Sequence, residues 1–350
     1  MNFLFEYGLF FAKALTIVIA IVAVLVVVLG LANKQKPGDN GNLELESLSE
    51  ELEDLSKMGK EALLSKEDLK QFHKDEKKEK KAKKKDKNKS DAKSDEEKDK
   101  KNNLFVVDFH GSSMAKEVET LRKEITAILC IANKGDEVLV KVESGGGVVH
   151  GYGLAASQLK RLKDKGFKLT ISIDKVAASG GYMMACVADK VIAAPFAIVG
   201  SIGVIAQLPN FNKLLKKNDI DFEMHTAGQF KRTLTLFGEN TDEGREKFQG
   251  ELEEVHQMFK AFVSENRTSI DIDQVATGEY WYGTKAKELN LVDDIQTSDD
   301  FLMTANESFK LFKLKYSTKK SFAQKLGFAV SQGIENGLSK VLTNVRNWHL

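Results

Sequence analysis

This chain of 350 residues contains little cysteine, and its positive and negative charges nearly balance. The two cysteines, Cys130 and Cys186, both fall in apolar helix-like segments, so we expect buried small hydrophobic side chains and no disulfide framework. No spacing of cysteine and histidine resembles a zinc site, and the six histidines are scattered. A formal net charge of +1 gives no global field that favours nucleic acid. We therefore expect no metal, no cofactor and no nucleic-acid partner.

One long uncharged stretch lies near the N-terminus. Residues 14–32 carry no charge over 19 positions, which is long enough to cross the hydrocarbon core of a bilayer. The run is longer than the apolar region of a typical signal peptide, and no clear small-x-small cleavage site precedes Lys34. The sequence therefore predicts an uncleaved transmembrane anchor within residues 1–33. Lysines flank it on both sides, and the charge rule only weakly favours a cytoplasmic location for the rest of the chain.

Residues 34–102 read as a tether. Leucines at spacings of three and four predict a short amphipathic helix within residues 43–72. From Lys74 to Lys101, 14 lysines and 9 acidic residues occupy 28 positions, and no apolar residue larger than alanine appears. Such a stretch cannot bury a core, so we expect it to be solvated. The interleaved acidic residues argue against a lipid-headgroup or nucleic-acid role for its lysines.

From residue 103 onward, strand-like and helix-like segments alternate. The strand candidates are 104–109, 137–142, 167–173 and 190–194, and the helix candidates are 115–131, 152–163 and 182–188. This alternation predicts βαβ units, a parallel sheet and therefore the α/β class. Ligands of such sheets bind at the carboxyl ends of the strands, where the loops 143–151 and 174–181 begin.

A corner of small residues follows the third strand candidate. The segment Ala177-Ala178-Ser179-Gly180-Gly181 joins that strand to an apolar helix-like stretch. Ser179 can cap the helix with its hydroxyl, which is a common role of serine at a helix N-terminus. It can also act as a nucleophile, because free backbone N–H groups and the helix dipole favour developing negative charge there. The corner alone leaves both interpretations open.

The loop after the second strand carries three consecutive glycines, Gly145 to Gly147. Glycine permits backbone conformations closed to other residues, so N–H groups of this loop can converge on one point. The loop can thus form an oxyanion hole or an anion nest, or serve as a flexible turn. It lacks the Gly-Lys-Ser/Thr ending of a phosphate-binding loop and the Gly-x-Gly-x-x-Gly of a dinucleotide site.

A nucleophilic Ser179 needs a base. It does not lie in a Gly-x-Ser-x-Gly elbow, because Ala177 takes the place of the first glycine. Nothing in the spacing of His150 or His225 marks either histidine as a base. A lysine can serve when desolvation leaves it neutral, and Lys231 lies among small and apolar residues. A lone lysine is, however, usually a solvated surface group.

Several motifs together resemble the signal peptide peptidase A family of membrane-anchored serine proteases, and in particular its SohB branch. Ser179 stands in the family's Ala-Ser-Gly-Gly-Tyr context, and Lys231 follows 52 residues later in a Gly-x-Phe-Lys context. Ser201 stands in Gly-Ser-Ile-Gly, and Gly146 and Gly147 match the glycines of the family's Ser-Pro-Gly-Gly loop. Residues 104 to about 297 resemble the family, and the whole chain, anchor included, closely resembles its SohB branch.

The resemblance implies a crotonase/Clp-like ββα superhelix for a peptidase domain at residues 103–316, with an amphipathic tail at 317–350. It implies a nucleophilic Ser179, a Lys231 base that Ser201 orients, and an oxyanion hole formed by Gly180 with Gly146 or Gly147. It further implies peptide substrates rich in apolar residues, a ring of identical subunits, and a single-pass anchor in the bacterial inner membrane with the catalytic domain in the periplasm.

One departure from the family pattern keeps other functions open. Gly145 replaces the proline of Ser-Pro-Gly-Gly, and glycine should loosen the loop. A non-catalytic membrane scaffold on a protease fold is therefore one alternative. An acyl-CoA-binding crotonase-type enzyme is another, with Glu143 as its carboxylate near the glycine loop, although such an enzyme has no use for Ser179 and Lys231.

Overall fold

The computed structural model describes residues 8–11, 13–17, 41–65, 67–74 and 101–318. Most of the expected anchor, the Lys/Glu-rich part of the tether and nearly all of the C-terminal tail lie outside these residues, so these three expectations stay predictions. The chain divides into two units, residues 43–316 and residues 1–42 with 317–350. Within the described ranges no helix is long and apolar enough to cross a membrane.

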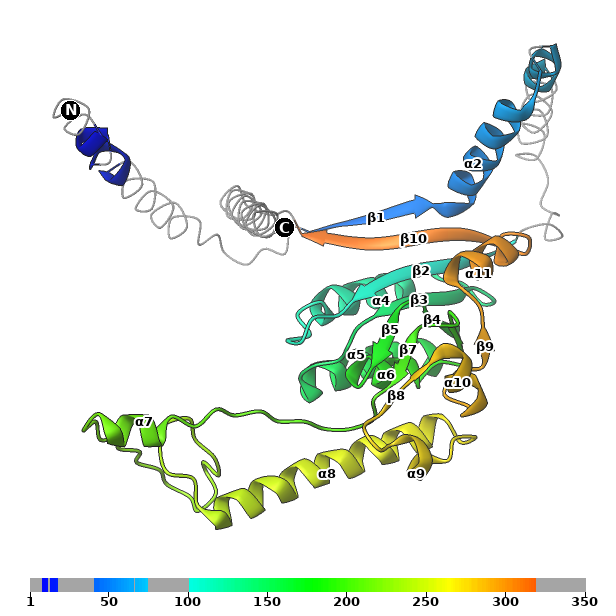
Figure 1. The fold of residues 1–350 in the computed structure, drawn as a ribbon. Coiled ribbons are helices and arrows are strands. Elements are labelled where there is room, and N and C mark those ends of the chain that lie inside the picture. Colours follow the sequence, from blue (N-terminus) through cyan, green and yellow to red (C-terminus); the bar gives the residue numbers. More distant parts are fainter. Residues whose placement is uncertain (1–7, 12, 18–40, 66, 75–100, 319–350) are drawn as a thin grey trace, which may run out of the picture. The chain divides into compact units, whose positions relative to one another are not determined.

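The larger unit is built on a sheet with the strand order β1-β10-β2-β3-β4-β6-β9 (Figure 1). Each neighbouring pair from β10 to β9 is parallel, as the alternation of strands and helices predicts. The strands are β1 (Gly41–Ser47), β10 (Phe309–Thr318), β2 (Asn102–His110), β3 (Glu137–Glu143), β4 (Lys168–Ile173), β6 (Lys190–Ala193) and β9 (Asp294–Ile295). The predicted α/β class and the four predicted strands are confirmed.

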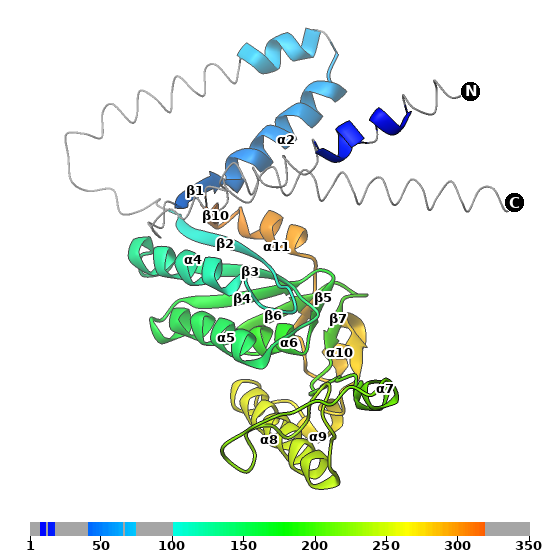
Figure 2. The same ribbon diagram turned by 90° about the vertical axis from the view of Figure 1, so that its left-hand side faces the viewer.

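Helices cover both faces of this sheet (Figure 2). Successive residues of a strand point to opposite faces. Val107 and Val140 therefore join the larger core, which lies beneath α4 (Val118–Ile131), α5 (Val149–Asp164) and α6 (Gly180–Ala185). Val106 and Leu139 join a smaller core on the other face, where α2 (Leu48–Leu63) and α11 (Ser298–Ala305) pack.

A small second sheet carries the corner with Ser179. It has the order β5-β7-β8, with β5 (Val176–Ala178), β7 (Ile198–Gly200) and β8 (Tyr280–Tyr282). The two sheets meet at Ser144, directly after β3. Its N–H donates to the Val176 carbonyl at 2.9 Å, and its carbonyl accepts the Ala178 N–H at 3.0 Å. This junction fixes the glycine loop beside the strand that leads to Ser179.

After β7 the chain leaves the sheets and returns along a long helix (Figure 1). We call residues 205–241 the excursion; it includes α7 (Asn212–Lys217). The return is α8 (Asp242–Asn266), followed by α9 (Ile272–Val275) and α10 (Gly283–Glu288). The hydroxyl of Thr241 accepts the Gly244 N–H at 3.1 Å and so caps the start of α8.

An ion pair fixes the other end of α8. The guanidinium of Arg267 binds both carboxylate oxygens of Asp293 at 2.8 and 2.9 Å and donates to the Asn290 carbonyl at 3.0 Å. The same carboxylate accepts the N–H of Val191 at 2.7 Å. Arg267 is only 8% exposed. The pair therefore joins α8 to β6 and to the segment that leads into β9.

The short amphipathic helix predicted within residues 43–72 is confirmed as α2. It begins only at Leu48, because residues 43–47 belong to β1, which lies beside β10 at the edge of the sheet. Leu48 and Leu52 pack against the smaller core, so this part of the expected tether belongs to the folded unit.

The expectation that both cysteines are buried also fails for one of them. Cys186 is buried, and burial raises the pKa of its thiol to about 12. Cys130 is exposed. It lies about 200° around α4 from the buried Ile128, since each helical residue turns the chain by roughly 100°. The apolar pattern thus predicts the helix correctly but not which of its faces is buried.

Candidate active site

Ser179 stands between β5 and α6 in a backbone conformation that is rare for a residue with a side chain. Its φ is 51° and its ψ is −117°. It holds the N-cap position of α6, yet its hydroxyl accepts no capping hydrogen bond. Its backbone N–H donates to the Gly200 carbonyl at 2.8 Å, which fixes the corner. The capping interpretation is therefore wrong, and the hydroxyl is left available for chemistry.

Glycine is required at several positions around Ser179, because neighbouring atoms lie too close to leave room for a Cβ atom. A Cβ on Gly180 would lie 2.4 Å from Cγ of Tyr152, and a Cβ on Gly181 would lie 2.5 Å from the Ser144 carbonyl oxygen. Gly146 has a φ of +89°, and a Cβ there would lie 2.8 Å from both the Gly180 nitrogen and the Ser179 Cβ. The glycine loop therefore lies directly against the serine corner.

The backbone N–H groups near Ser179 differ in their partners. Gly146 donates its N–H to Oγ of Ser144 at 3.1 Å. The N–H groups of Gly147 and Gly180 have no hydrogen-bond partner among the residues that the structure describes. Of the two loop glycines that the sequence offers as oxyanion donors, Gly147 is thus the one with a free N–H.

A cleft of about 810 Å³ opens over this corner. Ser179 and Gly180 line it together with the glycine loop (145–149), Ser201 and residues 203–205. Val255, His256 and Phe259 of α8 form a further wall. The structure thus brings together Ser179, Ser201 and all the predicted oxyanion glycines.

Ser201 faces the cleft from the loop after β7. Its φ is +49°, its N–H donates to the Glu279 carbonyl at 2.8 Å, and its hydroxyl donates to the Gly278 carbonyl at 3.3 Å. A hydroxyl has one hydrogen and two lone pairs. Ser201 therefore keeps its acceptor side for a donor such as an ammonium group.

Lys231 does not line the cleft. It is exposed on the excursion, whose neighbouring residues lie against the first turns of α8. The ring of Phe230 lies 5.6 Å from Nζ of Lys247, and the Thr233 carbonyl crowds Gly244. The cleft wall begins at Val255, about 12 Å further along the same helix at 1.5 Å per residue. Lys231 therefore lies outside the cleft that Ser179 of the same chain lines.

His256 is a cleft residue that the sequence did not reveal. It lines the cleft from α8, and its Nε2 is enclosed without a hydrogen-bond partner among the described residues. A single histidine in a helix rich in Glu and Lys carries no recognisable spacing, so only the fold could place it in the cleft that Ser179 also lines.

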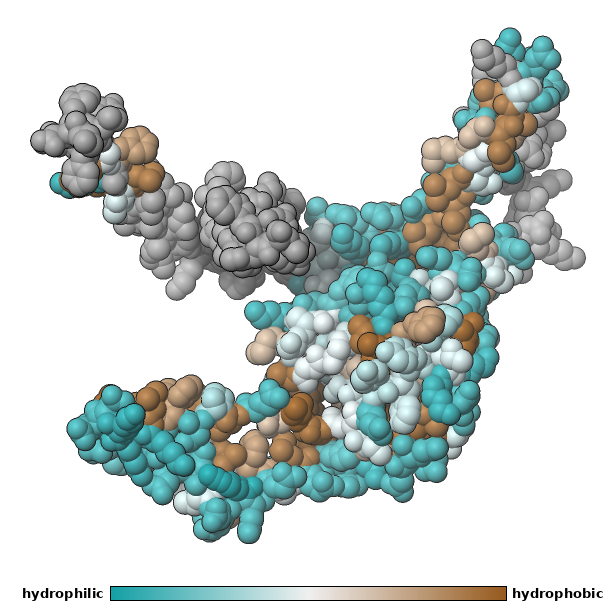
Figure 3. All heavy atoms as spheres, in the orientation of Figure 1, coloured by the Kyte–Doolittle hydropathy of each residue, from teal (hydrophilic) through white to brown (hydrophobic). Residues whose placement is uncertain are grey.

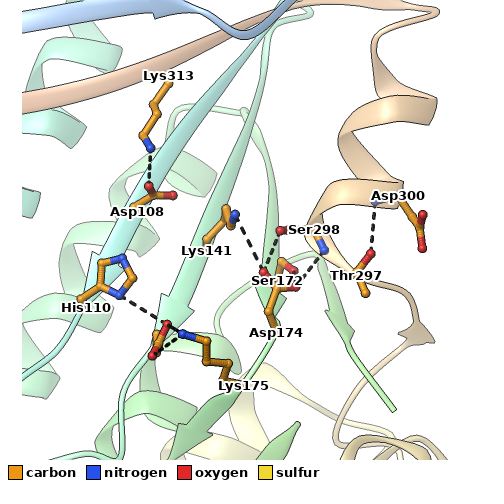
Figure 4. Close-up of polar contacts among 11 residues, drawn as sticks. Asp108, His110, Lys141, Ser172, Asp174, Lys175, Thr297, Ser298, Asp300 and Lys313 are labelled. Carbon is orange, nitrogen blue, oxygen red and sulfur yellow. Dashed lines mark hydrogen bonds and ion pairs between the residues drawn. The ribbon is translucent and has the colours of Figure 1, made fainter. Parts of the chain in front are cut away.

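A second group of polar side chains lies near the carboxyl ends of β2, β3 and β4, and Lys313 joins it from the middle of β10 (Figure 4). Its charges are paired: Lys313 with Asp108 at 2.7 Å, Lys175 with Glu143 at 3.0 Å, and Lys141 with Asp174 at 3.9 Å. Glu143 also lies 3.5 Å from His110, and Asp174 accepts hydrogen bonds from Ser298. These contacts hold the sheet and α11 together, so we assign the candidate active site to the cleft.

The comparison with known sequences decides the family. Residues 2–159 match the profile "Peptidase family S49 N-terminal", and residues 161–311 match "Peptidase family S49". The chain is 50% identical to the "Probable protease SohB" of Haemophilus influenzae over 96% of both chains. It is 49% identical to the protein of the same name from Buchnera aphidicola subsp. Schlechtendalia chinensis, over 87% of this chain and 100% of that one. The chain belongs to peptidase family S49.

This membership confirms the resemblance found in the sequence, including its SohB branch, and identifies the chain as a serine-type endopeptidase. Among solved structures, the chain is similar to a mutant of the 1510-N membrane-bound stomatin-specific protease in complex with a substrate peptide. That match has a TM-score of 0.42 and 11% identity, and covers 66% of this chain and 99% of the other. A ClpP1 mutant from Listeria monocytogenes matches with a TM-score of 0.39 and 16% identity, over 56% and 94%. Both scores are below 0.5, so the fold rests on the strand order above.

Replacing Gly145 by alanine is expected to stabilise the S49 chain by about 0.4–1 kcal/mol, because the unfolded chain loses freedom. No atom lies within 4 Å of the position its Cβ would take, and its φ is not positive. Its N–H has no partner among the described residues, so the family's proline would break no hydrogen bond either. Urea unfolding of the full chain in detergent measures the change.

The matched control is Gly146→Ala, where a positive φ and close contacts with Gly180 and Ser179 predict a clear loss of stability. A loss of stability in Gly145→Ala as well would contradict the open space found around Gly145.

Proposed function

We propose that the chain hydrolyses peptide bonds with Ser179 as nucleophile and Lys231 as base, with the N–H groups of Gly180 and Gly147 as oxyanion donors. The observation that carries this proposal is the hydroxyl of Ser179, which caps no helix and lines the cleft near two backbone N–H groups that have no partner among the described residues. Such donors stabilise a developing oxyanion by about 3–4 kcal/mol each.

The reaction runs in two halves. Oγ of Ser179 attacks the peptide carbonyl carbon while neutral Lys231 takes its proton, and the carbonyl oxygen becomes the oxyanion. When the intermediate collapses, Lys231 returns that proton to the leaving amine. The lysine then takes a proton from water, which attacks the acyl-serine ester. When this second intermediate collapses, the lysine returns the proton to Oγ of Ser179, and the carboxylic acid is released. Ser201 accepts a hydrogen bond from the lysine and orients it.

We infer that Lys231 reaches the cleft of a neighbouring copy of the chain. The segment that carries Lys231 lies against the first turns of α8, and the part of α8 that lines the cleft begins two turns further along. Because α8 is one continuous helix, these two regions stay apart within one chain. Figure 3 shows hydrophobic side chains along the excursion, which exposes Phe211, Phe222 and Phe230. Exposed apolar patches of this kind mark interaction sites. A ring of copies, which the family resemblance implies, would cover these side chains, and we infer that it would also complete each active site.

The cleft lining favours apolar peptide side chains. Val148, Val204, Ile205 and Phe259 line it, and no ion pair of the described residues lies in it. We propose apolar, signal-peptide-like or misfolded segments as substrates, since hydrophobic lining with few polar groups is typical of sites that bind such ligands.

We further propose a single-pass inner-membrane anchor over residues 14–32, on its apolar length, with the peptidase unit in the periplasm, as the family resemblance implies. A phosphatase reporter fused after residue 100 distinguishes a periplasmic from a cytoplasmic location of the peptidase unit. If only a cytoplasmic reporter fused at the same position were active, the proposed membrane orientation would be reversed.

Covalent labelling of the full chain with a fluorophosphonate probe near pH 8 tests the catalytic proposal. We expect labelling of the wild type and its loss in both Ser179→Ala and Lys231→Ala. His256→Gln is the control, because it changes a cleft residue that takes no proton in the proposed reaction. Loss in His256→Gln with labelling kept in Lys231→Ala would make His256 the base instead.

Labelling that persists in Ser179→Ala would refute the nucleophile. An unlabelled, folded wild type would favour the non-catalytic scaffold. The crotonase-type alternative needs a free carboxylate at the glycine loop, but Glu143 is paired with Lys175 and does not line the cleft.

A further inference from the structure

Beneath the glycine loop lies a row of hydrogen bonds that the proposed reaction does not use. Gly146 donates its N–H to Oγ of Ser144 at 3.1 Å. Oγ of Ser144 is hydrogen-bonded to the hydroxyl of Tyr152, which in turn donates to the Ser112 carbonyl at 2.9 Å. Ser144 is 2% exposed and Tyr152 is fully buried. Two buried hydroxyls thus join the glycine loop to the loop after β2.

The hydrogens fix the direction of this row. A backbone amide can only donate and a carbonyl can only accept, while each hydroxyl carries one hydrogen. Since Tyr152 gives its hydrogen to Ser112, it must accept the hydrogen of Ser144, and Ser144 accepts that of Gly146. The other acceptor within reach of Ser144, the Gly111 carbonyl, lies at 3.4 Å. Bonds aligned in this way strengthen one another, and breaking one leaves a buried group unpaired.

Burial raises the pKa of Tyr152, although its hydrogen bond with Ser144 acts in the opposite direction. The phenol therefore stays protonated at neutral pH and remains a donor to Ser112.

Both hydroxyl residues also touch the serine corner. The carbonyl of Ser144 accepts the N–H of Ala178, the residue before Ser179, at 3.0 Å. The ring of Tyr152 packs so closely on Gly180 that no Cβ fits between them. Moving either side chain would shift the glycine loop relative to the corner.

We propose that Ser144 and Tyr152 are positioning residues for the oxyanion hole: they hold the Gly146 N–H away from the substrate and so fix Gly147 as the loop donor opposite Gly180. This inference rests on the proposed function. Tyr152 is part of the cleft lining, but its hydroxyl is bound to Ser144 and Ser112, and Ser144 does not line the cleft. Their effect on the reaction therefore acts through the backbone of the loop.

The matched pair Tyr152→Phe and Tyr182→Phe tests it in the full chain. Both tyrosines are fully buried and each donates one hydroxyl hydrogen bond at 2.9 Å, but Tyr182 donates to the Leu291 carbonyl, remote from the loop. We expect Tyr152→Phe to lower the rate of fluorophosphonate labelling about tenfold or more, since loss of one oxyanion donor costs roughly 100-fold. Tyr182→Phe should stay within about twofold of wild type, with a similar loss of stability. Equal rates in the two variants would overturn the inference.

Ser144→Ala provides a second variant that keeps the aromatic packing. It should slow labelling in the same way and speed amide hydrogen exchange in the loop segment 144–148, measured by mass spectrometry, because the Gly146 N–H loses its acceptor. If amide exchange in this segment stayed unchanged, the proposed role of the two hydroxyls in holding the loop would be overturned, even if labelling slowed. If the wild type is not labelled at all, the proposed function fails, and the exchange measurement alone decides whether the row holds the loop.

Discussion

Co-expressed Ser179→Ala and Lys231→Ala chains are expected to regain about one quarter of wild-type labelling, although each variant alone is inactive. In a closed ring with head-to-tail contacts, each cleft would combine the serine of one copy with the lysine of the next. In a random mixture each of these is intact with a probability of about one half, which gives the quarter. A site completed within one chain would regain nothing, so the two arrangements differ qualitatively.

The control mixes wild type with the doubly substituted chain, Ser179→Ala with Lys231→Ala. Sites shared between copies again predict about one quarter, whereas sites within one chain predict about one half. Distinct affinity tags on the two chains allow mixed assemblies to be purified before labelling with the same probe. If confirmed mixed assemblies showed no recovery of labelling, the inference that Lys231 completes the active site of a neighbouring copy would be refuted.

Replacing Arg267 by alanine is expected to destabilise the fold by about 1.5–3 kcal/mol, because Asp293, whose side chain is 37% exposed, loses its charged hydrogen-bond donor at the end of α8. The control is Arg122→Ala, which breaks an exposed pair with Glu119 and should cost less than about 1 kcal/mol. Urea unfolding of both variants at pH 7 measures the difference. Similar losses in the two variants would contradict a structural role for the buried pair.

The same pair predicts how stability depends on pH. Burial acts to raise the pKa of Asp293, but the hydrogen bonds from Arg267 and from the Val191 N–H outweigh it, and the pKa lies below its ordinary value. A depressed pKa in the folded state means that the stabilisation is complete above the ordinary aspartate pKa and is lost as pH falls through the folded value. The gap between wild type and Arg267→Ala should therefore narrow below about pH 4. A gap that stays constant down to pH 2 would contradict this.

The sequence predicted the frame of the site because local patterns encode it. Alternating strands and helices predict the parallel sheet, and the glycine loop follows a predicted strand that the structure confirms. The corner around Ser179 instead follows β5, a short strand within residues that the sequence pattern assigns to a loop. The cleft then brings Ser179, Ser201, Gly146, Gly147 and Gly180 together. Short-range glycine and serine motifs are readable in this way since each fixes the backbone where it occurs.

Other parts of the site depend on contacts that no local pattern carries. Tyr152 appears in the sequence only as one residue of a helix, but the fold sets its hydroxyl against Ser144 and its ring against Gly180. His256 reaches the cleft because α8 returns across it after the excursion. The position of Lys231 depends on the course of the excursion, which the sequence pattern left undefined.

The backbone at Ser179 has a consequence for how the chain can change. A positive φ at a residue other than glycine costs about 1–3 kcal/mol, so glycine at this position would make the fold more stable. Selection for stability alone would therefore remove the proposed nucleophile, while selection for hydrolysis has to retain a less stable corner. A stabilised version of this protein obtained by choosing the most favourable residue at every position would be expected to lose the hydroxyl first.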